Sequence, residues 1–123
     1  MPFVAIISQI FMTSDLPILS FETVAALRSW LESNHDSSTG IFVRIYKKGS
    51  NITSVSFEDV LDEGLCFGWS ESMRLKGDDV SYLQKFTPRK TKGTTSERNK
   101  LHAKQLIKEG RMTASGLEKL GNF

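Results

Sequence analysis

The chain has 123 residues, a formal net charge of +2 and a single cysteine. This length is typical of one domain that buries roughly two-thirds of its unfolded surface, and the 39% of hydrophobic and 24% of charged residues are those of a globular protein. The lone cysteine excludes an internal disulfide framework and a cysteine-based zinc site of ordinary spacing, and it favours a reducing, cytoplasmic location.

The first 15 residues precede the part of the chain in which element patterns are recognisable. Residues 2–12 form an apolar run that is too short to span a membrane and lacks the charged start and small-residue cleavage site of a signal peptide. We interpret residues 1–15 as an N-terminal extension or an added strand. In one alternative, translation starts at Met12. A single domain is expected over residues 16–123.

A short strand and a helix are predicted next. Pro17 introduces an apolar stretch over residues 18–21, and residues 21–35 carry an apolar stripe at helical spacing, with Ser20 as the expected N-cap. His35 stands at the end of this helix. A solvated histidine, favoured by the negative end of the helix dipole, is a better interpretation of it than a general base or a metal ligand.

Residues 41–48 alternate between apolar and polar or aromatic side chains, which predicts a half-buried strand. Its outer face combines aromatic rings with basic side chains. Such a face could stack nucleic-acid bases, but we favour rings covered by a helix, with the cations reaching its edge.

The central helix is predicted over residues 56–67. Ser56 and Asp59 have the spacing of a capping box, and Gly68 is a natural helix stop. Cys66 falls on the side of this helix that carries three carboxylates: Asp59, Asp62 and Glu63. Because nearby carboxylates disfavour a thiolate, we expect a structural cysteine and not a nucleophile. The acidic side itself is expected to be solvated, the alternative being a metal cluster.

The second half of the chain predicts a hairpin and two helices. Two alternating runs, residues 71–76 and 80–86, flank a turn at residues 77–79, and Thr87-Pro88 ends the second strand. Helices are expected over residues 94–109, capped by Thr94, and over residues 114–120, capped by Thr113. This order predicts an α+β fold, a small and largely antiparallel sheet packed with helices. A parallel pairing of the strands at Ile41 and Glu71 across the central helix is a further possibility.

Four motifs follow one another along residues 16–120: Tyr46-Lys47-Lys48, Leu65-Cys66-Phe67-Gly68-Trp69, Phe86-Thr87-Pro88-Arg89, and Gly110-Arg111-Met112-Thr113 with Gly116-Leu117. In order and spacing they resemble the YdeI/OmpD-associated family, also called bacteriocin-protection proteins. The resemblance implies a small soluble bacterial protein associated with envelope stress or toxin protection, and no established reaction. Thr95-Ser96 stands where the family usually has Trp-Ser, which implies a more open site or a different ligand. Ser70-Glu71 replaces the usual Ile-Asp and keeps the carboxylate.

A binding pocket for a small anionic ligand or a protein partner is the leading functional hypothesis, with no cofactor, metal or catalytic residue assigned. Its candidate residues are Trp69, Glu71, Phe86, Arg89, Ser96 and Asn99, with Lys47 and Lys48 at the rim. We expect aromatic walls, a guanidinium suited to a carboxylate or phosphate, and backbone N–H groups at a helix start to converge there.

Two alternatives remain. Residues 85–111 hold nine basic and two acidic side chains, which could contact nucleic-acid phosphates. No nucleic-acid reader motif is present, and no aromatic residue lies between Phe86 and Phe123, so a solvated basic face is favoured. His102 in this segment is expected to be a half-buried structural residue. The other alternative is an enzyme that uses Glu71 or Cys66.

Overall fold

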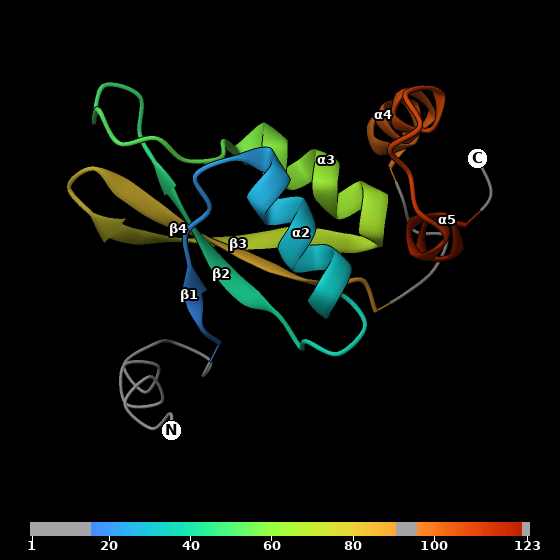
Figure 1. Ribbon diagram of the computed structural model, residues 1–123, viewed down its shortest axis with the longest axis horizontal. Coiled ribbons are helices and arrows are strands. Elements are labelled where there is room, and N and C mark those ends of the chain that lie inside the picture. Colours follow the sequence, from blue (N-terminus) through green and yellow to red (C-terminus); the bar gives the residue numbers. More distant parts are fainter. Residues whose placement is uncertain (1–15, 91–95, 122–123) are drawn as a thin grey trace.

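The computed structural model describes residues 16–90 and 96–121, which form four strands and four helices (Figure 1). In chain order these are β1 (Ile18–Leu19), α2 (Val24–Asn34), β2 (Ile41–Tyr46), α3 (Phe57–Phe67), β3 (Trp69–Asp78), β4 (Ser81–Pro88), α4 (Glu97–Lys108) and α5 (Ala114–Leu120). The predicted α+β fold with two C-terminal helices is confirmed. The predicted extension over residues 1–15 lies outside the described residues.

The strands form one sheet in the order β1-β2-β4-β3. β1 runs parallel to β2, with Ile18 opposite Phe42, and the β2–β4 and β3–β4 pairs are antiparallel. The possible parallel pairing of β2 with β3 is therefore wrong, because β4 lies between them. The burial of the strands accounts for this order. Ser81, Gln84 and Phe86 on the central strand β4 are buried, whereas β3 is largely exposed along its length, as expected of an edge strand.

The hairpin turn starts two residues later than predicted and is shorter, over residues 79–80 in place of 77–79. Asp78 pairs with Ser81, so Asp79 and Val80 form the turn and β3 continues through Gly77. The Asp78 carboxylate accepts hydrogen bonds from the Val80 N–H at 3.0 Å and from the Ser81 hydroxyl at 2.8 Å. These bonds place the turn after Asp78 and not at Gly77, because an aspartate side chain can organise the backbone that follows it.

Helices α2 and α3 cover one face of the sheet and supply the core with it (Figure 1). Leu27 and Leu31 of α2 and Val60 and Leu65 of α3 are fully buried, together with Ile41, Val43 and Ile45 from the same face of β2. Helix α3 also contacts β3, β4, α4 and α5, and so it is the element against which the others are arranged.

The helix caps follow short-range rules, with two corrections. Ser56 and Asp59 form the predicted capping box of α3, Gly68 ends that helix with φ 78°, and Thr113 caps α5. Helix α2 is capped by Thr23 and not by Ser20, since the Thr23 hydroxyl accepts the Ala26 N–H at 3.1 Å. Helix α4 is capped by Ser96; the predicted cap Thr94 lies outside the described residues.

Helices α4 and α5 lie together beyond the end of α3 (Figure 1). Ala103 and Leu106 of α4 and Leu120 of α5 are buried in the core. Within residues 16–90 and 96–121, no helix has the length and apolar character needed to cross a membrane.

Candidate functional site

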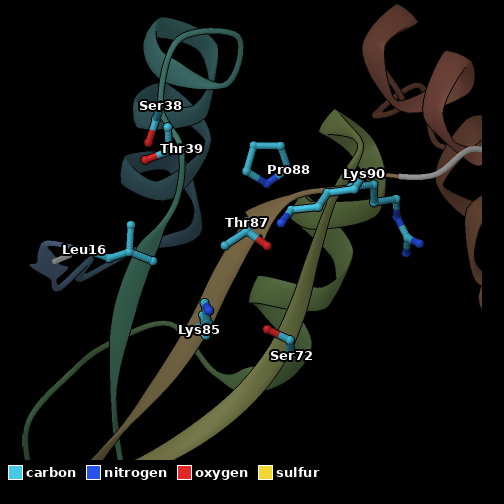
Figure 2. Close-up of a pocket in the computed structure, with 9 residues that line it drawn as sticks. Leu16, Ser38, Thr39, Ser72, Lys85, Thr87, Pro88 and Lys90 are labelled. Atoms are coloured by element: carbon cyan, nitrogen blue, oxygen red, sulfur yellow. The ribbon is translucent and has the colours of Figure 1, made fainter. Parts of the chain in front are cut away.

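A cavity of about 610 Å³ opens where the end of β4 meets the loop after α2 (Figure 2). Its lining comes from that loop, from β3, from β4 and the residues that follow it, and from the residue before Pro17: Leu16, Ser38, Thr39, Ser72, Lys85, Thr87, Pro88, Arg89 and Lys90. The antiparallel pairing of β2 with β4 brings these segments together, since Ile41 lies opposite Phe86. We call this space the Arg89 cavity.

Gly40 allows the loop after α2 to approach β4 closely. Its φ is +136°, in a region that side chains disfavour, and a Cβ there would lie 2.6 Å from the Thr87 Cγ2 atom. The hydroxyl-bearing residues Ser38 and Thr39 directly precede it, and they line the cavity together with Thr87 (Figure 2).

The lining of the Arg89 cavity is basic and rich in hydroxyl groups. Three of its residues are cations (Lys85, Arg89, Lys90), four carry hydroxyls (Ser38, Thr39, Ser72, Thr87), and none of the nine is acidic. Cations and hydroxyls together bind carboxylate and phosphate oxygens, because charge-assisted hydrogen bonds are stronger than neutral ones.

The position of Arg89 is fixed through its main chain. Its N–H donates to the Gly68 carbonyl at 2.9 Å, and its carbonyl accepts from Lys119 Nζ at 3.1 Å. Burial lowers the pKa of the Arg89 guanidinium, and the Glu71 carboxylate acts in the opposite direction. Among the described residues, 16–90 and 96–121, the buried Nε atom of Arg89 has no hydrogen-bond partner.

The predicted site residues are distributed over several places. Trp69 and Phe86 are buried in the core, 1% and 0% exposed, with ring centroids 5.0 Å apart. Glu71 is half-buried and pairs with Phe86 across the hairpin. Of the candidate residues, Arg89 lines the Arg89 cavity, and Trp69 lies beneath the strand end that carries it, opposite Pro88.

The remaining candidates lie away from that cavity lining. Lys47 and Lys48 are exposed after β2 and line a separate cavity of about 470 Å³. Ser96 and Asn99 form the start of α4, where the Asn99 N–H donates to the Ser96 hydroxyl at 3.2 Å. Thr95, the predicted departure from the resembled family, lies outside the described residues.

Sequence reasoning missed the hydroxyl side of the Arg89 cavity. Ser38 and Thr39 belong to a polar loop whose partner depends on the strand order, and this order was not predicted. Lys85 and Lys90 did carry a signal, since both belong to the basic segment that starts at residue 85.

The acidic side of α3 is only partly solvated, contrary to expectation, since Asp59 and Asp62 are half-buried and Glu63 is buried. Glu63 is 0% exposed, and its carboxylate lies 3.0 Å from Arg28 Nη1 and 2.7 Å from Arg111 Nη2. These two cations come from distant parts of the chain, so their pairing was not visible in the helix pattern. Cys66 is fully buried, as expected of a structural residue, and burial together with Glu63 raises the pKa of its thiol.

The two histidines also differ from one another. His35 is not a solvated helix-end residue: its ring contacts Leu31 and Ser115 and packs against Phe67, with ring centroids 5.2 Å apart. His102 is half-buried, as predicted, with Nε2 2.5 Å from the Asp62 carboxylate. Burial is the main cause of the raised pKa of Asp62.

A family described as "Domain of unknown function (DUF8412)" matches residues 19–119. The chain belongs to this family. No curated protein and no solved structure matches it. The DUF8412 match gives no support to the resemblance to YdeI/OmpD-associated proteins, which stays a prediction.

The basic segment of this DUF8412 domain is divided among different contacts. Arg111 binds the buried Glu63, and Lys100 pairs with Glu97 at 3.2 Å, so part of the positive charge is neutralised within the molecule. Within residues 16–90 and 96–121, no group of three or more His, Cys, Asp or Glu side chains is arranged to hold a metal ion.

Proposed function

We propose that this DUF8412 protein binds a small molecule carrying carboxylate or phosphate groups in the Arg89 cavity. The observation that carries the proposal is the lining, whose nine described residues include three cations and four hydroxyls and no acidic residue. The volume of about 610 Å³ supports a small molecule, since ligand pockets usually measure about 300–1,000 Å³.

The state of Arg89 supports an anionic ligand in particular. Its Nε atom is buried without a partner, and a buried donor without a partner costs about 1–3 kcal/mol. A bound carboxylate or phosphate would accept from this guanidinium and offset the burial that lowers its pKa.

Nucleic-acid binding by residues 85–111 is less well supported. Arg111 and Lys100 are engaged within the protein, whereas Lys85, Arg89 and Lys90 gather around one cavity. Nucleic-acid binding through many phosphates would weaken steeply with salt, so a gel-shift titration at two salt concentrations separates the two functions.

Thermal unfolding with added anions tests the proposal. Inorganic phosphate and citrate are compared with sodium chloride at equal ionic strength. A ligand at ten times its Kd stabilises the folded state by about 1.4 kcal/mol, which corresponds to a shift of several degrees in Tm for a domain of this size. We expect a shift with at least one of the two anions, beyond that of sodium chloride, and its loss in Arg89→Ala.

Lys76→Ala is the matched control, since Lys76 is an exposed cation on β3 that does not line the Arg89 cavity. It should keep the shift of the wild-type protein. Equal shifts in sodium chloride and in the two anions, or an undiminished anion shift in Arg89→Ala, would contradict the proposal.

The closer relationship to YdeI/OmpD-associated proteins is also kept as a proposal. Its support is that three of the four quoted motifs meet around the end of α3: the Arg89 N–H donates to the Gly68 carbonyl at 2.9 Å, and the Thr113 N–H donates to the Cys66 carbonyl at 3.0 Å. Superposition on a structure from that family tests it, because a shared strand order is expected and a different order would contradict the relationship.

A further inference from the structure

Another cavity, of about 310 Å³, lies between the end of α2, the end of α3 and helix α5. Its lining includes His35 and Ser115, whose side chains are 80 residues apart in sequence and 3.1 Å apart in space, from Nε2 to Oγ. A serine hydroxyl within hydrogen-bond reach of an imidazole, at the wall of a cavity, is the arrangement that activates serine nucleophiles. We call this space the Ser115 cavity.

The tautomer of His35 is set by its other ring nitrogen. Nδ1 lies 2.8 Å from the Leu31 carbonyl, which can only accept a hydrogen bond, so Nδ1 carries the proton. In the neutral ring Nε2 then has a free lone pair, and the Ser115 hydroxyl donates to it. This tautomer is the one that a general base requires.

Three further contacts hold His35 in place. The Trp69 indole N–H donates to the His35 carbonyl at 3.2 Å, the His35 N–H donates to Leu31 at 2.8 Å, and the ring packs against Phe67. Trp69, a residue singled out from the sequence, thus positions the histidine. Such fixed geometry lowers the entropic cost of proton transfer.

The backbone supplies the charge that a third carboxylate residue supplies in other serine sites. His35 is the C-cap of α2, so its ring lies at the negative end of the helix dipole, with Nδ1 2.8 Å from the Leu31 carbonyl. Lys119 also lines the cavity. It uses one N–H on the Arg89 carbonyl and retains further donors for an oxyanion.

Gly68 brings α5 to this position. A Cβ at Gly68 would lie 2.6 Å from Lys119 Cγ and 2.9 Å from the Ser115 carbonyl, so the close approach of α5 to the end of α3 depends on the missing side chain. Sequence patterns identified Gly68 as a helix stop but gave no sign of this contact.

We propose that Ser115 is a nucleophile and His35 its general base in an acyl-ester hydrolase site. Ser115 Oγ forms a bond to the acyl carbon while its proton moves to His35 Nε2. The bond from the acyl carbon to the alcohol oxygen then breaks, and that oxygen takes the proton from Nε2. A water molecule repeats the two steps, which releases the carboxylic acid and restores the serine.

The adjoining Arg89 cavity indicates the class of ester, and this part rests on the proposed function. Ser38 and Pro88 line both cavities, so the two spaces are neighbours. An ester with a carboxylate or phosphate on its acyl or alcohol part could place the anion beside Arg89 and the ester carbonyl at Ser115.

Labelling with an uncharged fluorophosphonate tests the nucleophile without using the Arg89 cavity. We expect a covalent adduct on the peptide that contains Ser115, identified by mass spectrometry, and none in Ser115→Ala. His35→Asn keeps an N–H donor for the Leu31 carbonyl but removes the base, and it should slow labelling by about 10²–10⁴-fold. Circular dichroism checks whether both variants are folded.

Ser33→Ala is the matched control, because Ser33 is exposed on α2, two residues before His35. It should label at the wild-type rate. An unlabelled wild-type protein, or equal labelling of wild type and Ser115→Ala, overturns the proposal. The Ser115→Ala comparison decides even if His35→Asn does not fold.

Ester hydrolysis separates this proposal from the anion site. The two substrates are the uncharged 4-nitrophenyl ester of butyrate and the anionic 4-nitrophenyl ester of succinate. The wild-type protein should hydrolyse both, and Ser115→Ala and His35→Asn should hydrolyse neither. The wild-type protein should hydrolyse the succinate ester faster than the butyrate ester, and Arg89→Ala should lose this preference. If Arg89→Ala keeps the preference, the anion site fails and the nucleophile stands.

Discussion

Glu63 is a charged residue enclosed in the core between two guanidinium groups. Its side chain is 1% exposed, and the side chains of Arg28 and Arg111 are 28% and 34% exposed. Arg28 also donates to the Arg111 carbonyl at 2.7 Å, so one carboxylate joins α2, α3 and the segment before α5. The desolvation of a buried carboxylate is offset only while both partners remain in place.

Replacing this carboxylate should destabilise the fold. Glu63→Gln keeps the volume but removes the charge, and breaking a fully buried pair costs about 3–5 kcal/mol. Because both arginines are partly exposed, we expect a smaller loss of about 2–3 kcal/mol in the free energy of unfolding, measured by urea denaturation. Glu32→Gln is the control, since this carboxylate is 62% exposed and 3.9 Å from Arg28. It should change stability by less than about 0.5 kcal/mol; equal losses in the two variants would contradict the role of Glu63.

At the scale of elements, the attachment of α5 to α3 depends on Gly116. A Cβ there would lie 2.3 Å from the Cys66 carbonyl oxygen and 2.6 Å from that of Leu65, and neither backbone atom can move aside. In an unobstructed helix Gly→Ala gains about 0.5–1 kcal/mol. Here the clash should outweigh that gain, so Gly116→Ala is expected to lose about 1–3 kcal/mol of stability in urea denaturation. Leu117→Ala, on the exposed side of the same helix, should change it by less than about 0.5 kcal/mol. A neutral or stabilising Gly116→Ala would contradict this account.

The elements themselves were largely predictable, because the rules that define them act over a few residues. The capping box at Ser56 and the stops at Gly68 and Pro88 are local, and each appears in the structure near its predicted position. The hairpin turn was misplaced because Gly77 is a typical turn residue, whereas the structure uses the Asp78 carboxylate to organise the residues that follow it, and sequence alone does not decide between the two. Local rules thus locate elements better than they locate turns.

At the scale of the whole molecule, strand order and buried pairing could not be predicted. The pairing of β2 with β4 joins residues about 40 positions apart, and it creates the Arg89 cavity by bringing Ser38 to Thr87. The contacts of Glu63 with Arg111 and of His35 with Ser115 span 48 and 80 residues. Arg89 was identified because its chemistry is visible in one residue, whereas the residues around it depend on the topology.

Several of the described titratable groups have pKa values that the fold shifts. The pKa of Asp62 is raised, chiefly by burial, whereas hydrogen bonds lower those of the exposed Asp78 and Glu109. Raised and lowered carboxyl pKa values have opposite effects on stability in acid, so these contributions partly cancel. In the alkaline range, the Cys66 thiol is the group with a shifted pKa whose charge changes, because the arginines with shifted pKa values remain charged there. Among the described groups with shifted pKa values, its effect on stability is therefore not cancelled by another.

The sign of the Cys66 effect follows from proton binding. Its pKa is raised by burial first and by Glu63 second, so the folded protein keeps the thiol proton to a higher pH than the unfolded chain, in which the pKa is about 8.5. The stabilisation is complete below that pH and is lost as the pH rises toward the folded value. The free energy of unfolding of the wild-type protein should therefore decrease between pH 8 and 10, with this thiol contributing up to about 1.4 kcal/mol per pH unit.

Urea denaturation across this range, with a reductant present, compares the wild-type protein with Cys66→Ala. The variant starts from a lower stability because the side chain is fully buried, but its curve should fall less steeply, since the remaining titrating groups are shared. The difference between the two slopes isolates the thiol. Parallel curves would show that Cys66 binds its proton equally in the folded and unfolded states. Ionisation of the thiol would then have no effect on stability.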